Sequence, residues 1–371
     1  MKPPDWLRLD RELAVLLGLT SLIALAVGLV AYGRVTRDLV REAEQELALR
    51  VELEVSSLEQ ELETMHSEVL LWRDHGPPRD ALRQTSAAWA ELGPTAGERL
   101  RRLYVTENPF PEGERYKYER APDNSAYTQF HAWAHWRSER FLNVLGYHDI
   151  FLIDPQGNVV YSYFKEEDFG TSLEDGPWRD TALGEVFRQA RESSDGEVAF
   201  RDFERYEPSQ GAPSAFLAGP VFESDGELLG VLGFQFLSSR LNDHLRFNAD
   251  IGATGETFIV GEDFLMRSAS RFADTSAVLV QRVDSESVRR ALARETGVET
   301  GDDYRDIEVV AAYSFLDFGG VRWAVIAKID LEEVLMPARA LRRNLLLTAL
   351  AVLVIVALGG AVAPGPLTRN Q

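Results

Sequence analysis

The chain has 371 residues, no cysteine and a formal net charge of −20 at pH 7. Without cysteine it forms no disulfide, no thiolate nucleophile and no cysteine-ligated zinc site. Its acidity disfavours binding to nucleic acid or to anionic lipid headgroups, because a negative surface repels both. The length leaves room for two ordinary domains.

Two apolar segments without a charged side chain lie near the ends of the chain, at residues 13–32 and 345–363. A helix rises about 1.5 Å per residue, so each segment is long enough to cross a bilayer core of about 30 Å. The first is longer than the apolar part of a signal peptide, and no clear cleavage site follows it. We therefore expect two transmembrane helices, both retained in the protein.

The basic residues near these segments do not decide the orientation, because the first segment has equal numbers of them on its two sides. The large acidic middle of the chain is instead expected outside the cytoplasm. Residues 1–12 and 364–371 then form short cytoplasmic tails. Such a topology is typical of a receptor's sensing half.

A long polar helix is predicted over residues 33–75, directly after the first apolar segment. Its apolar residues are separated alternately by three and four positions, namely Ala48, Val51, Val55, Leu58, Leu62, Met65, Val69 and Trp72. This heptad spacing puts them on one face of the helix. The face either packs on the chain's own domain or forms a coiled coil with a second copy in a homodimer.

Strands are predicted in the second part of the chain. An apolar strand at 147–154 turns back into a strand at 159–163, and a helix follows at 180–192. Two more strands are expected at 215–222 and 228–237. This first unit therefore contains two hairpins separated by a helix.

A second unit repeats the same order. Its strands are predicted at 256–261, 265–268, 307–315 and 321–329, with a helix at about 285–295. The repetition indicates an internal duplication at the level of topology. Strands mixed with short helices predict two α+β domains.

Short phrases also match between the two units: residues 151–154 match 258–261, and residues 231–236 match 323–328. The expected domain bounds are 76–247 and 248–330. A connecting helix at 331–344 then leads into the second apolar segment.

These phrases resemble the double Cache sensor domain of bacterial transmembrane receptors. The matching stretches are YHDIFLIDPQGNVVYS at 147–162, DFERYEPSQGAPSAFLA at 202–218, GETFIVGEDFLMRSASRF at 255–272 and DYRDIEVVAAY at 303–313. The resemblance covers about residues 33–343. It implies two stacked PAS-like mixed sheets on a long N-terminal helix, facing the periplasm from a bacterial inner membrane that the chain crosses twice. Chemoreceptors, sensor histidine kinases and cyclases carry such domains.

Two departures from the family pattern affect the functional interpretation. Such receptors usually continue into a HAMP linker and a signalling module, whereas residues 366–369 resemble only the start of a HAMP helix. The output module is therefore expected to be lost or supplied by a separate cytoplasmic partner. The family's Arg-x-Trp-Tyr amino-acid motif is also absent, and Gly176-Pro177-Trp178-Arg179 stands at the comparable place. An amino-acid ligand is not predicted.

A ligand pocket is expected in the first unit, because small-molecule sites combine apolar walls with a few polar groups. The candidate lining residues are the aromatic Phe151, Tyr161, Tyr163, Trp178, Tyr206 and Phe216 and the polar Arg179, Asp202 and Gln235. Asp202 would hold a ligand amine and Arg179 a carboxylate. The alternative is that the aromatic residues fill the core of a small sheet. In the second unit, Glu256, Arg267 and Arg271 are expected to form structural ion pairs.

The sequence predicts neither an enzyme nor a cofactor, since it contains no nucleophile elbow and no phosphate-binding loop. His131 and His135 are spaced like zinc ligands on one helix face, but Ala132 stands where a zinc protease has its glutamate. The leading hypothesis is a membrane-bound sensor that binds a small molecule and transmits a conformational signal. A dimeric membrane-anchored scaffold and an extracytoplasmic metal-binding protein are the alternatives.

Overall fold

The computed structural model of the chain describes residues 11–74, 77–194, 196–245, 251–273 and 277–361. Most of the predicted N-terminal tail, residue 75 at the end of the predicted long helix, the last two residues of the second apolar segment and the predicted C-terminal tail lie outside the described residues.

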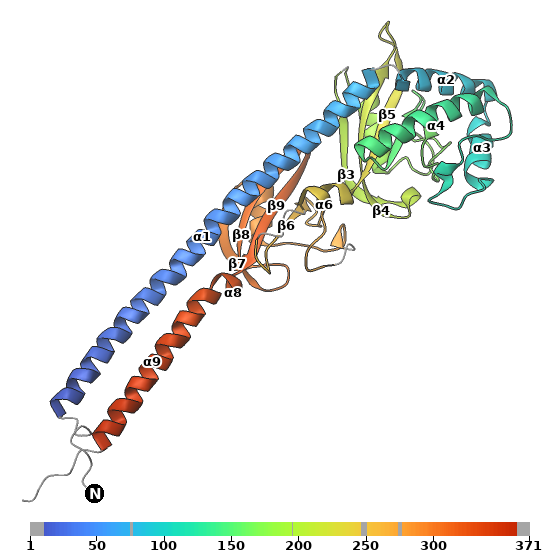
Figure 1. Cartoon of the computed structure of the whole chain (residues 1–371). Helices are drawn as coiled ribbons and strands as arrows, with labels where there is room; N and C mark the ends of the chain where they lie inside the picture. The colour runs from blue at the N-terminus through green and yellow to red at the C-terminus, as the bar shows by residue number, and fades with distance from the viewer. Residues whose placement is uncertain (1–10, 75–76, 195, 246–250, 274–276, 362–371) are drawn as a thin grey trace, which may run out of the picture.

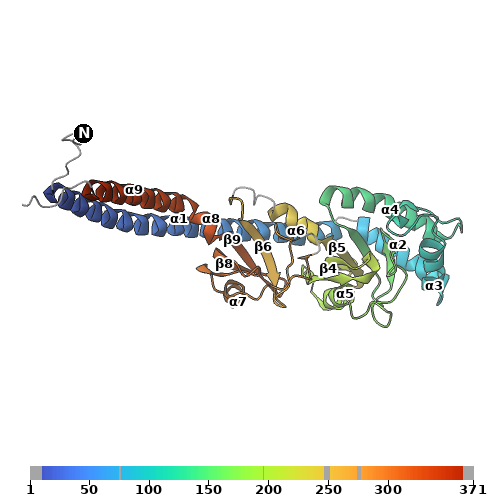
Figure 2. The ribbon, with the colours of Figure 1, turned by 90° about the horizontal axis from the view of Figure 1, so that it is seen from below.

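One long helix extends along most of the length of the molecule. Helix α1 (Arg11–Asp74) has 64 residues and joins the first apolar segment to the predicted polar helix without a break. Figure 1 shows both sheets against one part of α1 and helix α9 (Met336–Ala361) beside the other part, and Figure 2 shows the same arrangement from below. The chain is therefore an elongated body with a two-helix end.

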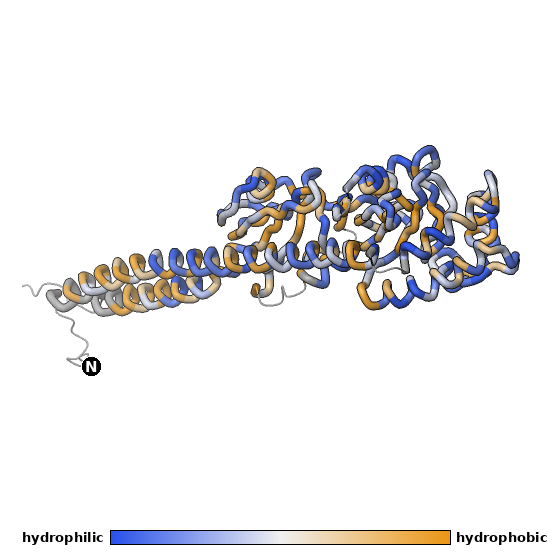
Figure 3. Tube along the Cα trace, turned by 90° about the horizontal axis from the view of Figure 1, so that it is seen from above, coloured by the Kyte–Doolittle hydropathy of each residue, from blue (hydrophilic) through white to orange (hydrophobic). Residues whose placement is uncertain are grey.

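The two-helix end is the apolar end of the molecule. Among the residues that the structure describes, α1 is the one helix long and apolar enough to cross a membrane, and its most apolar window is not buried by the protein. Figure 3 shows apolar residues along the paired parts of α1 and α9 and hydrophilic residues where the pair approaches the sheets. The double crossing remains a prediction.

The predicted apolar stripe of α1 packs against the chain's own sheets from Val51 onward, whereas Ala48, its first predicted residue, is exposed. Val51, Leu58, Leu62, Met65 and Val69 are all buried in one cluster with residues of both sheets. Burying such a side chain contributes roughly 1.5–3 kcal/mol to the stability of the folded chain. Of the two interpretations of the stripe, packing on its own domain is correct for this part of the helix, and coiled-coil dimerisation remains a prediction.

Three helices form the end of the body farthest from α9: α2 (Pro77–Leu92), α3 (Ala96–Arg101) and α4 (Ala126–Leu145). A π-helical turn (Arg102–Thr106) and a 3₁₀ turn (Arg115–Lys117) connect α3 to α4. Helix α4 begins where the Ser125 side chain accepts a hydrogen bond from the Thr128 N–H, and it ends at Gly146, which has a left-handed φ of 73°.

The first sheet is antiparallel, with the order β2-β1-β5-β4-β3. Its strands are β1 (Asp149–Ile153), β2 (Val159–Ser162), β3 (Ala199–Tyr206), β4 (Ala212–Phe222) and β5 (Leu228–Leu237). Successive residues of a strand face opposite sides. Ile150 therefore joins the cluster that contains α1, while Phe151 joins the cluster beneath α5 (Ala182–Glu192). Helix α6 (Ser238–Leu245) follows β5.

The second sheet is also antiparallel, with the order β6-β9-β8-β7. Its strands are β6 (Glu256–Gly261), β7 (Gly297–Asp302), β8 (Glu308–Phe318) and β9 (Val321–Asp330). Helix α7 (Glu286–Leu292) covers one face and α1 the other. Strand β9 continues directly into the short helix α8 (Leu331–Val334), which precedes α9. The predicted α+β class with two sheets on a long N-terminal helix is confirmed.

The structure corrects three details of the predicted strands. The expected strand at 265–268 forms only isolated bridges, Val260 with Met266 and Leu265 with Arg282. The edge strands β3 and β7, each paired on one side only, were missing from the prediction. Their outward side chains are polar or exposed, so their sequences lack an apolar run.

The duplication is clearest in the register of the strands. Asp149 opens β1 and pairs with Gln235 on β5, while Glu256 opens β6 and pairs with Lys328 on β9. Position 235 therefore corresponds to 328. The phrase match predicted from the sequence, which aligned Phe236 with Lys328, was wrong by one residue.

Candidate ligand-binding site

A group of buried polar side chains lies at one corner of the first sheet, where β1 begins and β5 ends. Asp149 is completely buried, and its Oδ1 accepts hydrogen bonds from the backbone N–H groups of Ile150, Tyr163 and Phe164 at 2.7, 2.9 and 3.2 Å. Three donors on one oxygen fix the orientation of the carboxyl group. Its other oxygen, Oδ2, is buried without a hydrogen-bond partner.

The segment after β2 brings two more carboxyl groups into this corner. Lys165 has a left-handed φ of 56°, which turns the chain so that Glu166 and Asp168 are both buried. Tyr206 donates a hydrogen bond to Asp168 Oδ2 at 2.6 Å, and Ser209 donates one to Glu166 Oε2 at 2.5 Å. The end of β3 and the turn after it therefore hold this segment.

Gln235 completes the corner from β5. Its Nε2 donates to the hydroxyl oxygens of Ser209 and Ser214, at 2.8 Å in both cases. Its Oε1 is buried and has no partner, and the same is true of Asp168 Oδ1. Together with Asp149 Oδ2, three oxygens of the corner are left as unused acceptors. An unsatisfied buried polar group costs about 1–3 kcal/mol.

The electrostatics of the corner favour the uptake of positive charge. Burial raises the pKa of Asp149 well above its usual range, and the charges of Glu166 and Asp168 raise it further. Burial, followed by the charge of Glu166, raises the pKa of Asp168 to about 7. Acidic groups that share a buried site keep their protons at a higher pH than usual, unless a cation in the site stabilises the charged carboxylates.

The hydrogen bonds of Lys165 join it to groups other than these carboxyl groups. Its ammonium lies 3.2 Å from His135 Nδ1 and donates to the carbonyl oxygen of Tyr163 at 3.0 Å. Burial lowers the Lys165 pKa to about 7. The Lys165 charge therefore does not fill the acceptor corner through a direct hydrogen bond.

The two histidines that suggested a zinc site belong to a buried aromatic stack. The rings of His131 and His135 are 5.6 Å apart, and His135 stacks on Tyr163 at 4.5 Å. His131 Nδ1 lies 2.9 Å from the carbonyl oxygen of Glu119. Within the described residues no group of three or more histidine, aspartate or glutamate side chains is arranged to hold a metal ion. The zinc alternative thus finds no third ligand there.

The nine predicted site residues are distributed over several places. Tyr206 and Gln235 lie in the acceptor corner, and Phe216 packs on Tyr206 with a ring distance of 4.9 Å. Phe151 and Trp178 belong to the same cluster beneath α5. The Trp178 indole donates to the carbonyl oxygen of Glu167 at 3.1 Å and so anchors the segment that carries the carboxyl groups.

The other four predicted residues lie elsewhere. Tyr161 and Tyr163 belong to the cluster on the opposite face of the sheet, which includes residues of α4. The Arg179 side chain is 61% exposed and pairs with Asp180. Asp202 accepts hydrogen bonds from Arg267 and Trp323 of the second domain. Of the three predicted polar residues, Arg179 and Asp202 therefore lie outside the corner.

Sequence reasoning missed the acidic residues that define the corner. Asp149 is the acidic first residue of the otherwise apolar strand β1, and Glu166 and Asp168 belong to the run Lys165-Glu166-Glu167-Asp168 after β2. An acidic residue at the start of an apolar strand was a usable signal. The position of these acidic residues in space depends on the left-handed backbone of Lys165, which is not predictable from the sequence.

Comparison with known proteins identifies the family. The family model described as Cache domain matches residues 36–338. No curated protein matches the chain. The ligand-binding domain of the Pseudomonas aeruginosa PAO1 amino acid chemoreceptor PctC in complex with GABA is 15% identical, with 77% of this chain and 99% of that chain covered and a TM-score of 0.43.

The periplasmic sensory domain of the Campylobacter jejuni chemoreceptor Tlp1 is 13% identical, with 81% of this chain and 99% of that chain covered and a TM-score of 0.46. The family match spans most of the chain and includes both sheets and the part of α1 on which they lie. This chain therefore belongs to the Cache domain family.

Proposed function

We propose that this protein is a membrane-anchored sensor that binds a small organic cation, such as a primary amine, in the acceptor corner of the first sheet. The observation that carries the proposal is the set of three buried oxygens without partners: Asp149 Oδ2, Asp168 Oδ1 and Gln235 Oε1. An ammonium group has three donors, so it can donate a hydrogen bond to each of these oxygens. Its positive charge also favours the ionised form of the two carboxyl groups, which opposes the rise in their pKa caused by burial. Membership of a family of ligand-binding sensor domains fits a binding role rather than a catalytic one.

A route from the corner to the two-helix end supports a signalling role. The carboxyl group of Asp202 joins β3 to Arg267 and to Trp323 on β9. Strand β9 continues into α8 and α9, and α9 packs along α1. A ligand that favours one packing of the sheets over another by a few kcal/mol would shift the populations at the far end of this route.

The membrane topology belongs to the same proposal. We place the apolar part of α1 and residues 345–363 in an inner membrane, with both sheets in the periplasm and the far ends of the helices toward a separate cytoplasmic partner. The unburied apolar window of α1 supports one crossing. Helix α9 runs beside that part of α1, and this arrangement supports the second crossing.

The binding step is testable with defined amines on the full chain in detergent. We expect at least one n-alkylammonium ion of one to six carbons to raise the melting temperature saturably, while the alcohol of equal length does not. The variants Asp149→Asn and Asp168→Asn should lose this response. Each keeps an oxygen for the hydrogen bonds that hold it but carries no negative charge.

Asp180→Asn is the matched control, because Asp180 is an aspartate of the same domain whose side chain is 91% exposed. It should respond to the amine like the unchanged protein. Equal responses of Asp149→Asn and Asp180→Asn, or no response of the unchanged protein to any of the amines, would refute the proposed site.

A homodimer is the second proposal. Leu49 and Leu53 are 58% and 59% exposed and lie one helical turn apart on α1, away from the stripe that packs on the sheets. Exposed leucines at this spacing suit a partner helix. We propose that two copies pair through this face, which differs from the seam predicted by the sequence.

A further inference from the structure

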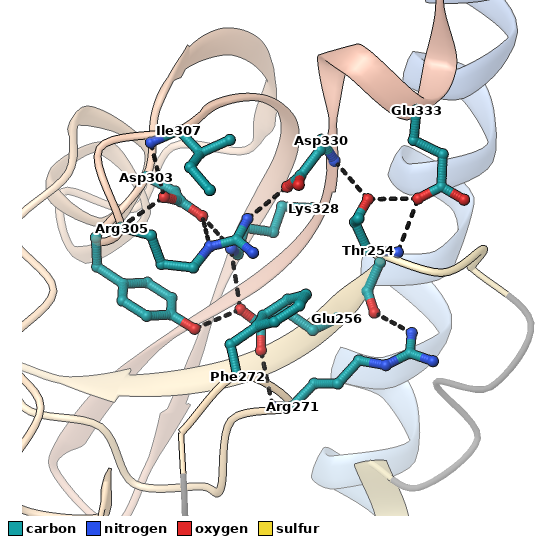
Figure 4. Close-up of polar contacts among 12 residues, drawn as sticks. Thr254, Glu256, Arg271, Phe272, Asp303, Arg305, Ile307, Lys328, Asp330 and Glu333 are labelled. Carbon is teal, nitrogen blue, oxygen red and sulfur yellow. Dashed lines mark hydrogen bonds and ion pairs between the residues drawn. The ribbon is translucent and has the colours of Figure 1, made fainter. Parts of the chain in front are cut away.

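The corner of the second sheet that corresponds to the acceptor corner contains an ammonium group of the chain itself. Lys328 and Glu256 are each 1% exposed, and Lys328 Nζ lies 3.0 Å from Glu256 Oε1. The same nitrogen bonds Asp303 Oδ2. The rings of Tyr304 and Phe272 lie 4.7 and 5.3 Å from it. Figure 4 shows this cage of two carboxylates with Phe272 beside it.

The correspondence between the two corners follows from the strand register. Asp149 pairs with Gln235 across β1 and β5, and Glu256 pairs with Lys328 across β6 and β9. Both acidic residues open their strands, and both lie on the sheet face that a short helix covers. Where the first sheet has an amide and unused acceptors, the second sheet has an ammonium group.

The second corner is complete as it stands. Glu256 also accepts hydrogen bonds from Ser270 at 2.8 Å, from Tyr304 at 2.7 Å and from the Arg271 N–H at 3.0 Å. Asp303 also pairs with Arg305 at 2.7 Å. The cavity beside Lys328 measures about 10 Å³, which is room for one water molecule. No small amine enters such a space while the lysine occupies it.

The filled corner is connected to the start of the membrane-directed helices. Arg305 bonds both Asp303 and Asp330, the last residue of β9. The Asp330 N–H donates to Thr254 Oγ1 at 3.1 Å, and the Thr254 N–H donates to Glu333 of α8 at 2.7 Å. These contacts, all drawn in Figure 4, fix α8 against the corner.

We propose that Lys328 is a tethered ligand: it occupies, from within the chain, the ammonium site of the second sheet. The second domain then takes no external amine, and its sheet and α8 are held permanently in the arrangement that a bound cation stabilises. This inference goes beyond the proposed function and holds whether or not the first sheet binds an amine.

The test replaces the tethered ammonium by a free one. Lys328→Ala removes Cγ, Cδ, Cε and Nζ, which together are the atoms of n-propylammonium. The variant is prepared in the full chain that also carries Asp149→Asn, so that the first corner does not respond. We expect its melting temperature to fall, and n-propylammonium to restore on the order of 3–5 °C of it saturably.

Two controls separate a site from a general effect of the amine. n-Propanol has the same length without the charge and should restore nothing. Lys328→Met, in the same background, fills the space with an uncharged side chain of similar length and should not respond to n-propylammonium. Equal shifts in the Ala and Met variants, or no shift in either, would overturn the proposal.

The Ala variant has a further readout if it does not fold alone. Expressed and purified with n-propylammonium throughout, it should be recovered folded and lose its structure when the amine is dialysed away. Failure to recover folded protein with the amine, while Lys328→Met folds, would contradict a tethered ligand and indicate an ordinary structural ion pair.

Discussion

Asp202 and Arg267 join the two sheets by a two-point ion pair. Asp202 Oδ2 lies 2.9 Å from Nε and 2.8 Å from Nη2 of Arg267, and the two side chains are 20% and 5% exposed. The other oxygen, Oδ1, accepts a hydrogen bond from the Trp323 indole at 2.9 Å. The carboxylate that the sequence suggested for a ligand amine thus has an arginine as its partner.

We expect Asp202→Asn to destabilise the full chain by about 2 kcal/mol, because a largely buried guanidinium loses the more buried of its two carboxylate partners. Urea unfolding measures the loss. Asp263→Asn is the matched control: Asp263 pairs with the same arginine at 2.9 Å but is 48% exposed, so its loss should stay below about 1 kcal/mol. Equal losses of the free energy of unfolding in the two variants would show that the ion pair between the sheets contributes no more to stability than an exposed ion pair.

Asp168 predicts an unusual dependence of stability on pH. Burial and the neighbouring Glu166 raise its pKa to about 7, so between about pH 4 and 7 the folded state holds a proton that the unfolded state has released. Stability from this group is therefore largest at low pH and is lost as the pH rises toward 7. The difference is on the order of 2–4 kcal/mol.

The measurement compares the unchanged chain with Asp168→Asn, by urea unfolding at pH 5 and pH 8 without amine. The unchanged chain should lose more stability over this range than the variant, because asparagine binds no proton. Parallel pH profiles would contradict the raised pKa. Glu174→Gln serves as a control, since Glu174 pairs with Arg191 outside the corner.

The same group predicts how amine binding depends on pH. An ammonium ion competes with the proton on Asp168, so affinity should increase between pH 6 and pH 8 and level off above the pKa. Isothermal titration at fixed ionic strength measures this change. In the Asp168→Asn variant the remaining affinity should vary less over this range, and a steeper variation there would assign the titration to another group.

The limits of sequence-based prediction show in individual residues. The strands β1 and β5 were predictable because their apolar runs are long, whereas β3 and β7 have polar outward side chains and pair on one side only. The apolar stripe of α1 was visible, but its spacing is the same for a sheet and for a second helix. Only the structure identifies the neighbour of Leu58.

The candidate site was less predictable than the fold. Its aromatic residues were found because aromatic side chains mark cores and pockets alike. The carboxyl groups of Asp149, Glu166 and Asp168 come from a strand start and a turn, and their meeting depends on the left-handed residue Lys165. Long-range geometry of this kind has no periodic signal in the sequence.

Gly28 permits the close approach of α1 and α9. A Cβ atom at Gly28 would lie 2.8 Å from Leu345 Cδ2, too close for an unchanged packing. We expect Gly28→Val to move α9 outward by about 1 Å, since interhelical distances depend on the side chains at the contact. Because the chain has no cysteine, two introduced cysteines at the exposed positions Arg37 and Arg343 can carry spin labels for a distance measurement.

Gly18→Val is the control for this experiment, because a Cβ atom at Gly18 has no neighbour within 4 Å. It adds the same side chain to the same apolar part of α1 and should leave the label distance unchanged. Equal displacement by both variants would mean that valine acts on the helix in general and not through Leu345.

The exposed leucines of α1 predict where two copies meet. Leu49→Glu combined with Leu53→Glu should convert the dimer to a monomer without unfolding it, because neither side chain belongs to the core. Light scattering in detergent, together with circular dichroism, measures both effects. Val144→Glu is the control, since it adds the same charge at an apolar position outside α1, on α4, that is 80% exposed. Leu58→Glu, on the buried stripe, should instead unfold the chain by placing a charge in the core. If Leu58→Glu gave a folded monomer while the double variant remained a dimer, the dimer interface would instead be the apolar stripe of α1 that the heptad spacing predicted.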